Sequence, residues 1–172
     1  MQLNKLFFAA VLLGGTTPVI AHAAQLVTAS RTSFSLRLTA TLLSVHTGES
    51  LSVAIALTNI TDGTTGVRED ISHKGEFTYR VFAYAENQKK APTTAYYRAI
   101  WGEPLPEDPQ VSVDSSFVTR RIQPGKSLVN NVDVTSLYDL RHPGIYTIWV
   151  ERADYVSHMR VKSNTVNVTV TP

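Results

Sequence analysis

The sequence predicts an all-β protein, built as an antiparallel sandwich of two sheets with about seven to nine strands. Three observations predict this class. Apolar and polar residues alternate with a period of two in many short segments, turn residues separate those segments, and no stretch sustains the 3.6-residue period of a helix. Alternation of this kind places one set of side chains on the buried face of a sheet and the other on its exposed face. Short strands with regularly spaced turns are typical of a β-sandwich.

The strongest strand signals fall in seven segments. In chain order these are residues 34–42, 51–57, 77–85, 117–122, 128–134, 146–151 and 166–171. Residues 67–75 and 95–101 are weaker strand candidates. Residues 136–140 and the poorly patterned residues 67–72 are candidates for one helical turn. Residues 77–85 carry large apolar side chains on both faces, which predicts a strand in the centre of its sheet.

The first 23 residues are predicted to lie outside this fold, as a cleaved signal peptide. Lys5 precedes the apolar residues 6–13, and Ala21-His22-Ala23 has the small-x-small pattern of a cleavage site. The apolar run is well short of the roughly 20 residues that span a bilayer. We therefore expect an exported protein, periplasmic or secreted, with no membrane insertion after cleavage. Residues 24–33 are expected to form a loose leader, and residues 34–172 the sandwich.

Charge and composition limit the function further. The chain has 16 basic and 14 acidic residues, a balance that argues against the concentrated basic face of a nucleic-acid binder. It contains no cysteine, so its stability in an exported setting must come from burial and not from disulfides. We expect a monomer with an unidentified partner, for which a protein or a carbohydrate remains open and a nucleic acid is not expected.

The segment Pro143-Gly144-Ile145-Tyr146 resembles the approach to the penultimate strand of immunoglobulin-like domains. This resemblance implies a structural corner at Gly144 and Tyr146, with the tyrosine hydroxyl bonded to upstream backbone. The chain lacks the paired cysteines of antibody domains, and residues 77–85 contain no tryptophan. The resemblance is therefore to exported bacterial immunoglobulin-like domains of uncharacterised role.

A second, weaker resemblance is to bacterial proteinase-inhibitor domains of the Bacillus type. It rests on Asn59-Ile60-Thr61 at a strand end, the aromatic residues 79–90, the turn at residues 124–127, and Pro-Gly-x-Tyr-Thr at residues 143–147. This resemblance implies an inhibitor that presents loops from one end of the sandwich. The loops at residues 59–66 and 96–109 would form such a wedge.

No residue pattern predicts catalysis, a cofactor or a metal site. There is no Gly-x-Ser-x-Gly nucleophile turn, and His73 with Glu76 does not supply the three or four ligands of a zinc site. The acidic residues at 69–70 and 103–108 could flank a glycoside, but solvation of exposed segments explains them more simply. We expect a protein that is not an enzyme.

One candidate for a partner-binding loop stands out at residues 96–109. It holds aromatic, basic and apolar side chains of the types that anchor protein interfaces: Tyr96, Tyr97, Arg98, Trp101 and Leu105. The alternative, which we favour, is that Trp101 and one of the tyrosines fold back and cap the core. Trp149 alternates out of phase with Tyr146, so we expect it on the outer face of its sheet.

Three functions remain open from the sequence. The first is a non-catalytic immunoglobulin-like module that binds a partner or contributes to envelope structure. The second is a proteinase inhibitor. The third is an envelope or surface assembly subunit that exchanges a strand, which is less favoured because the final strand at residues 165–171 is present and the leader is a poor donor.

Overall fold

The computed structural model describes residues 31–72, 76–110 and 113–172, and it confirms an all-β protein. The predicted signal peptide and residues 24–30 of the leader lie outside the described residues. Two short helices accompany the strands. The elements in chain order are β1 (Phe34–Ala40), β2 (Ser44–His46), β3 (Ser52–Asn59), β4 (Thr65–Asp70), β5 (Arg80–Ala85), α1 (Ala95–Trp101), β6 (Phe117–Ile122), β7 (Ser127–Asp133), α2 (Val134–Leu137), β8 (Gly144–Asp154), β9 (Met159–Lys162) and β10 (Val166–Thr171).

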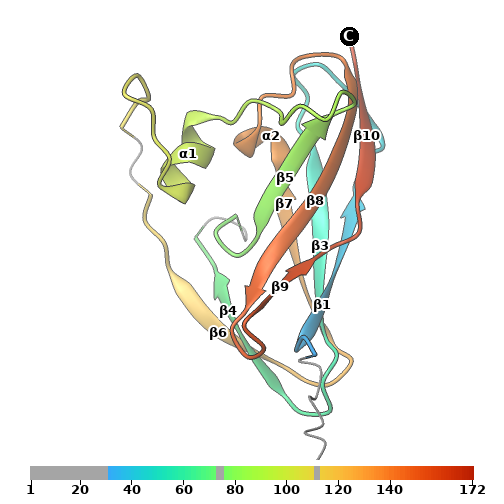
Figure 1. Cartoon of the computed structure of the whole chain (residues 1–172), viewed down its shortest axis with the longest axis vertical. Helices are drawn as coiled ribbons and strands as arrows, with labels where there is room; N and C mark the ends of the chain where they lie inside the picture. The colour runs from blue at the N-terminus through green and yellow to red at the C-terminus, as the bar shows by residue number, and fades with distance from the viewer. Residues whose placement is uncertain (1–30, 73–75, 111–112) are drawn as a thin grey trace, which may run out of the picture.

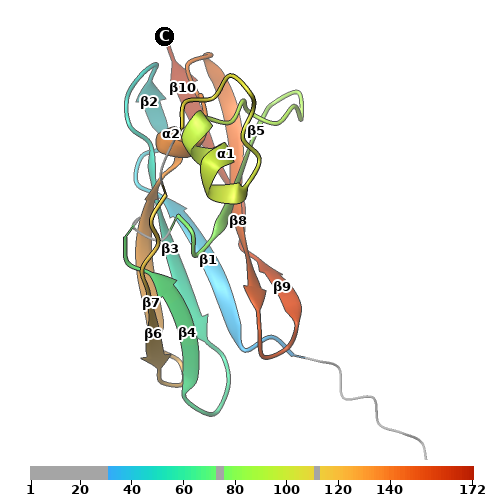
Figure 2. The ribbon, with the colours of Figure 1, turned by 90° about the vertical axis from the view of Figure 1, so that its left-hand side faces the viewer.

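The strands form three sheets. One has the order β1-β3-β7, a second has the order β2-β10-β8-β5 with β9 beside β8, and the third is the two-stranded ribbon β4-β6. All pairs are antiparallel except β2 with β10. The two larger sheets lie as separate layers, and the ribbon runs beside them at the lower end of the molecule (Figures 1 and 2). The third sheet was not expected from the sequence.

The core lies between the two larger sheets, and period-two alternation explains it. In β3 every second residue is buried, and Val53, Ile55 and Leu57 have no exposed surface. Val81 and Ile148 of the other sheet are equally buried and belong to the same apolar cluster. Full burial of an aliphatic side chain contributes about 1.5–3 kcal/mol, so these facing rows provide much of the driving force for folding.

Asn59 explains how the ribbon forms. Its side chain is almost fully buried, and its Nδ2 donates to the carbonyl oxygens of Gly63 at 2.7 Å and Ile122 at 2.8 Å. Its Oδ1 accepts from the backbone N–H of Thr61 at 2.9 Å. The side chain thereby ties the turn after β3 to the end of β6. The Asn59-Ile60-Thr61 motif thus holds the turn after β3 against the end of β6 by hydrogen bonds.

The prediction that residues 77–85 form a central strand is wrong. The strand β5 begins only at Arg80, and it lies at the edge of its sheet next to β8. Its outer-face aromatics are covered by each other and not by a second layer. Trp149 of β8 stacks on Phe82 at 5.2 Å and on Tyr84 at 5.0 Å between ring centroids, and the Lys162 ammonium lies 4.2 Å from the Trp149 ring. Trp149 therefore lies on the outer face, as its alternation predicts.

The strand candidate at residues 95–101 is also wrong, because this segment is the helix α1. The Thr94 hydroxyl caps the helix by accepting from the N–H of Tyr97 at 3.1 Å. Gly102 ends the helix in the left-handed conformation, with φ of 68°. Tyr97 and Trp101 are four residues apart, so a helix places both on one face, where they pack on the core.

Two smaller expectations also changed. The weak candidate at residues 67–75 is the strand β4, which ends at Asp70, and residues 73–75 lie outside the described residues. The helical turn expected at residues 136–140 is α2, and it begins slightly earlier, after an N-cap at Asp133.

Candidate functional site

The first part of the loop predicted to bind a partner, residues 96–101, is folded against the core. Tyr97 has no exposed surface, and its ring lies 5.2 Å from Tyr138 and 6.4 Å from Trp101. Of the five predicted residues only Leu105 is exposed, at 46%. An exposed aromatic surface, the less favoured of the two predicted arrangements, is therefore not found at Tyr96, Tyr97 and Trp101. The alternative arrangement, in which Trp101 and a tyrosine cap the core, is the one observed.

Polar contacts fix the other two predicted residues. The Tyr96 hydroxyl donates to Oε2 of Glu76 at 2.6 Å, and Arg98 forms an ion pair with Asp108. Burial and the adjacent Glu76 carboxylate raise the pKa of Tyr96. The hydrogen bond from Arg98 lowers the pKa of Asp108 to about 2. Both side chains thus hold the segment in place.

The wedge of two loops predicted for an inhibitor does not form. The turn between β3 and β4 lies at the lower end of the molecule, whereas α1 and the loop that follows it lie near the opposite end (Figure 1). The chain runs upward from this turn through β4 and β5 before it reaches α1, so the two loops lie at opposite ends (Figure 1). An inhibitory surface would need a different segment.

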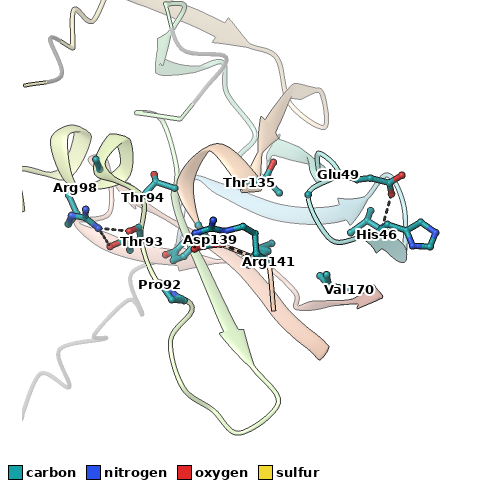
Figure 3. Close-up of a pocket in the computed structure, with 15 residues that line it drawn as sticks. His46, Glu49, Pro92, Thr93, Thr94, Arg98, Thr135, Asp139, Arg141 and Val170 are labelled. Carbon is teal, nitrogen blue, oxygen red and sulfur yellow. Dashed lines mark hydrogen bonds and ion pairs between the residues drawn. The ribbon is translucent and has the colours of Figure 1, made fainter. Parts of the chain in front are cut away.

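A polar groove of about 580 Å³ lies between α1, the turn after β2 and the segment after α2 (Figure 3). The charged side chains that line this groove are paired with neighbouring groups of the chain. Arg141 forms an ion pair with Asp139 at 2.6 Å, and this hydrogen bonding lowers the pKa of Asp139 to about 2. Glu49 accepts from the backbone N–H of His46 at 2.7 Å. The groove therefore offers little unpaired charge to a ligand.

The His46 ring is engaged at the C-terminal end of the chain. Its Nδ1 lies 3.0 Å from the Pro172 carbonyl oxygen and 3.0 Å from the Thr171 hydroxyl. Residues 31–72, 76–110 and 113–172 contain no group of three His, Cys, Asp or Glu side chains placed to hold a metal ion. Within the same ranges, no helix is long and apolar enough to cross a bilayer.

The most exposed apolar side chains near one another lie at the turn between β8 and β9, a hairpin tip that the sequence analysis missed. Tyr155 is 77% exposed, Val156 71% and Met159 42%. Turn positions normally carry Gly, Asn, Asp, Ser or Pro, so an adjacent Tyr and Val in a tight turn are an available sequence signal. We refer to residues 154–159 as the hairpin tip.

Asp154 holds the hairpin tip in one conformation. Its carboxylate is 2% exposed and accepts from the backbone N–H of Val156 at 3.0 Å and the Ser157 hydroxyl at 2.7 Å. It also accepts from the N–H of Ser33 at 2.5 Å and the Ser33 hydroxyl at 2.8 Å. Burial alone would raise the pKa of Asp154, but these hydrogen bonds outweigh it and hold the pKa below its ordinary value.

One exposed basic side chain, Arg160, lies next to the hairpin tip. The Arg160 side chain is 71% exposed, and its guanidinium is 3.9 Å from Glu151, a distance that gives only a weak, solvent-screened interaction. His158 adopts a left-handed backbone with φ of 58°, which closes the turn. The tip is thus a preformed apolar projection beside the exposed Arg160 side chain.

The structural corner has the hydrogen bond that the immunoglobulin-like resemblance implies. The Tyr146 hydroxyl donates to the His142 carbonyl oxygen at 2.9 Å, and the ring is buried. Gly144 opens β8 with φ of 151°.

Replacing Tyr146 with phenylalanine is expected to lower the free energy of unfolding by about 1 kcal/mol. The ring stays packed, but the hydrogen bond to His142 is lost. Urea denaturation monitored by tryptophan fluorescence measures this. An unchanged free energy of unfolding would show that this hydrogen bond adds nothing to stability.

No protein-family model and no curated protein sequence matches the chain. Similar solved structures include the β-glucosidase from Listeria innocua in complex with isofagomine, at 15% identity and a TM-score of 0.42, over 81% of this chain and 16% of that one. The β-glucosidase EmGH1 from Erythrobacter marinus gives 12% identity and a TM-score of 0.42, over 81% and 16%. This chain spans less than a fifth of either structure, and likenesses at this level assign neither a family nor an activity.

Proposed function

We propose that the protein is an exported, non-catalytic immunoglobulin-like β-sandwich that binds a protein partner through the hairpin tip. The strand order supports the fold assignment. The order β1-β3-β7 opposite β10-β8-β5 corresponds to the order A-B-E opposite G-F-C of immunoglobulin-like domains. The corner tyrosine Tyr146 lies near the start of β8, the counterpart of strand F.

The observation that carries the binding proposal is the exposure of Tyr155 and Val156 on a rigid turn. Tyrosine is a favoured interface anchor, because it buries a large area with few rotatable bonds. Asp154 already holds the turn backbone, so little conformational entropy is lost when a partner binds. Such a surface is better suited to macromolecular recognition than the groove beside α1, whose charges are internally paired.

The test is a comparison of variants in capture from envelope extract and culture medium. Tyr155→Ser combined with Val156→Ser is expected to abolish capture of the partner and to change the free energy of unfolding by less than about 0.5 kcal/mol, because both side chains are exposed. Leu105→Ser is the matched control, since it removes an exposed apolar side chain elsewhere. Capture that is insensitive to the double variant would contradict the proposal.

The same hairpin tip supports proteinase inhibition as a second candidate. A rigid, exposed turn with a large apolar side chain at its apex is suited to entering a protease cleft, and Tyr155 provides that side chain. Stoichiometric inhibition within a panel of serine, cysteine and metalloproteinases, lost in Tyr155→Ser and kept in Leu105→Ser, would favour this candidate. Absence of inhibition across the panel would contradict this candidate and leave partner binding as the proposed function.

A further inference from the structure

The strand β6 has an open edge, and the hydrogen-bond pattern of the ribbon identifies the groups along it. Beside the ribbon, the N–H of Ile71 donates to the carbonyl oxygen of Ser116 at 2.9 Å. Hydrogen-bonded and non-bonded pairs alternate along an antiparallel ladder. In the register of β4 with β6, the backbone groups of Phe117, Thr119 and Arg121 therefore point away from β4.

The opposite edge of β4 confirms this alternation independently. The N–H of Asp70 donates to the Thr78 hydroxyl at 2.9 Å, and the carbonyl oxygen of Arg68 accepts from Nη2 of Arg152 at 2.5 Å. Asp70 and Arg68 lie opposite Phe117 and Thr119 in the register. Both partners of each such pair thus turn their backbone groups outward.

Parts of two other sheet edges, on β1 and on β5, are closed by the protein itself. The Asn164 side chain accepts from the N–H of Leu38 at 2.8 Å and donates to its carbonyl oxygen at 3.0 Å, which covers part of β1. On β5, Ala83 accepts from the N–H of Ala91 at 2.9 Å. Among the described residues, β6 has β4 as its single neighbouring strand. Unpaired backbone groups in a row are a template for another strand.

The charges on the ribbon face that carries Phe117, Thr119 and Arg121 determine which kind of strand could pair with β6. The Arg68 guanidinium lies 4.0 Å from the centre of the Phe117 ring, and Arg121 has no carboxylate partner among the described residues. Arg120, on the other face, is held by Glu69 at 2.7 Å. An antiparallel second copy centred on Thr119 would place Arg121 opposite the copy's Phe117, whose ring already carries the Arg68 guanidinium, so two arginines would lie together without a carboxylate and repel.

We propose that the outer edge of β6 accepts an acidic, extended segment of another protein as an added antiparallel strand. The incoming strand would place an acidic residue opposite Arg121, a small polar residue opposite Thr119 and an apolar residue opposite Phe117. Main-chain hydrogen bonds provide the affinity in this mode of recognition, and the alternate side chains provide the specificity. This surface is separate from the hairpin tip, so either can fail without the other.

The experiment uses the purified protein and an acetylated, amidated peptide with the core Glu-Ser-Thr-Ser-Ile. NMR hydrogen exchange is expected to show added protection at the amides of Thr119 and Arg121. The amides of Val118 and Arg120 already bond to β4 and should change little. A peptide with Lys in place of Glu is expected to bind about tenfold more weakly, because it faces Arg121.

Two variants test the proposal by different routes. Thr119→Pro removes an outward N–H, which an edge strand tolerates, and is expected to abolish peptide binding. Val129→Pro is the matched control, because the pattern of β3 with β7 also turns the Val129 N–H outward, but on a different edge. Arg121→Glu is expected to reverse the preference between the Glu and Lys peptides, and it does not depend on a proline being tolerated.

Three results would overturn the proposal. Protection at Val129 and Asn131 in place of Thr119 and Arg121 would put the added strand on β7. Equal binding of the Glu and Lys peptides would remove the acidic specificity. A dimer in light scattering that is lost in Thr119→Pro would make a second copy the occupant of the edge.

Discussion

Replacing Tyr97 with alanine is expected to lower the free energy of unfolding by about 3–5 kcal/mol, as for other large aromatic side chains removed from a core. Tyr97 has no exposed surface and packs against Tyr138 and Trp101. Its loss leaves a cavity under α1, which the short helix cannot close without leaving its caps at Thr94 and Gly102. Urea denaturation monitored by far-UV circular dichroism measures the loss.

The control for this prediction comes from the same segment. Leu105→Ala removes an apolar side chain that is 46% exposed and is expected to change stability by less than about 0.5 kcal/mol. Tyr97→Phe keeps the ring and should retain most of the stability. A small effect of Tyr97→Ala, similar to that of Leu105→Ala, would mean that the segment does not cap the core in solution.

Replacing Asp154 with asparagine is expected to lower the free energy of unfolding by about 2–3 kcal/mol at neutral pH, the scale of buried hydrogen bonds to a charged group. Its carboxylate accepts from two backbone N–H groups and two hydroxyls, of Ser33, Val156 and Ser157. An asparagine side chain has one oxygen and turns an NH₂ group toward some of these donors. Urea denaturation at pH 7 measures this difference.

The stability difference between the wild type and Asp154→Asn is expected to depend on pH. The pKa of Asp154 is lower in the folded protein than the ordinary value of about 3.9. Its stabilisation is therefore fully present above that value and is lost as pH falls through the folded pKa. The gap in stability between the wild type and Asp154→Asn should be constant from pH 7 to about 5 and shrink below about 3.9. A gap that stays constant to pH 2 would contradict this assignment.

Asp154→Asn also tests whether partner binding depends on the rigidity of the hairpin tip as well as on its exposed side chains. Faster hydrogen exchange at the Val156 amide is expected, together with weaker partner binding, although Tyr155 and Val156 are both retained. Unchanged exchange would show that the Asp154 carboxylate is not what holds the turn. Ser50→Ala is a suitable control, because its hydroxyl bonds to the half-buried Asp133 at the other end of the molecule.

The sequence predicted those strands whose alternation reflects a single buried face. β3 and β10 fall within a residue or two of their expected positions, because their inward side chains pack across one core. β5 was misplaced because large side chains on both faces usually mean cover from both sides. Here Trp149 provides the outer cover from within the same sheet, a contact that depends on strand register.

The helix α1 and the hairpin tip show two other limits. Thr94 and Gly102 are recognisable caps, but the segment between them is only two turns long, and its aromatic residues also favour strands. At the hairpin tip, Tyr155 and Val156 form an isolated apolar pair that follows the polar end of β8. Whether such residues are buried or exposed depends on where the neighbouring strands end, which the period of one segment does not specify.

The anchoring of β1 has a mechanical consequence. β1 begins at the lower end of the molecule, and the chain ends at Pro172 at the upper end (Figure 1). Tension applied between these ends would pull β1 along its own axis, so its ladder with β3 would be loaded in shear, with all its hydrogen bonds strained together. Two further hydrogen bonds would be strained with this ladder. The Ser33 N–H donates to the Asp154 carboxylate, and the Leu38 N–H donates to the Asn164 side chain. The domain is therefore built to resist stretching along its length better than peeling from its side.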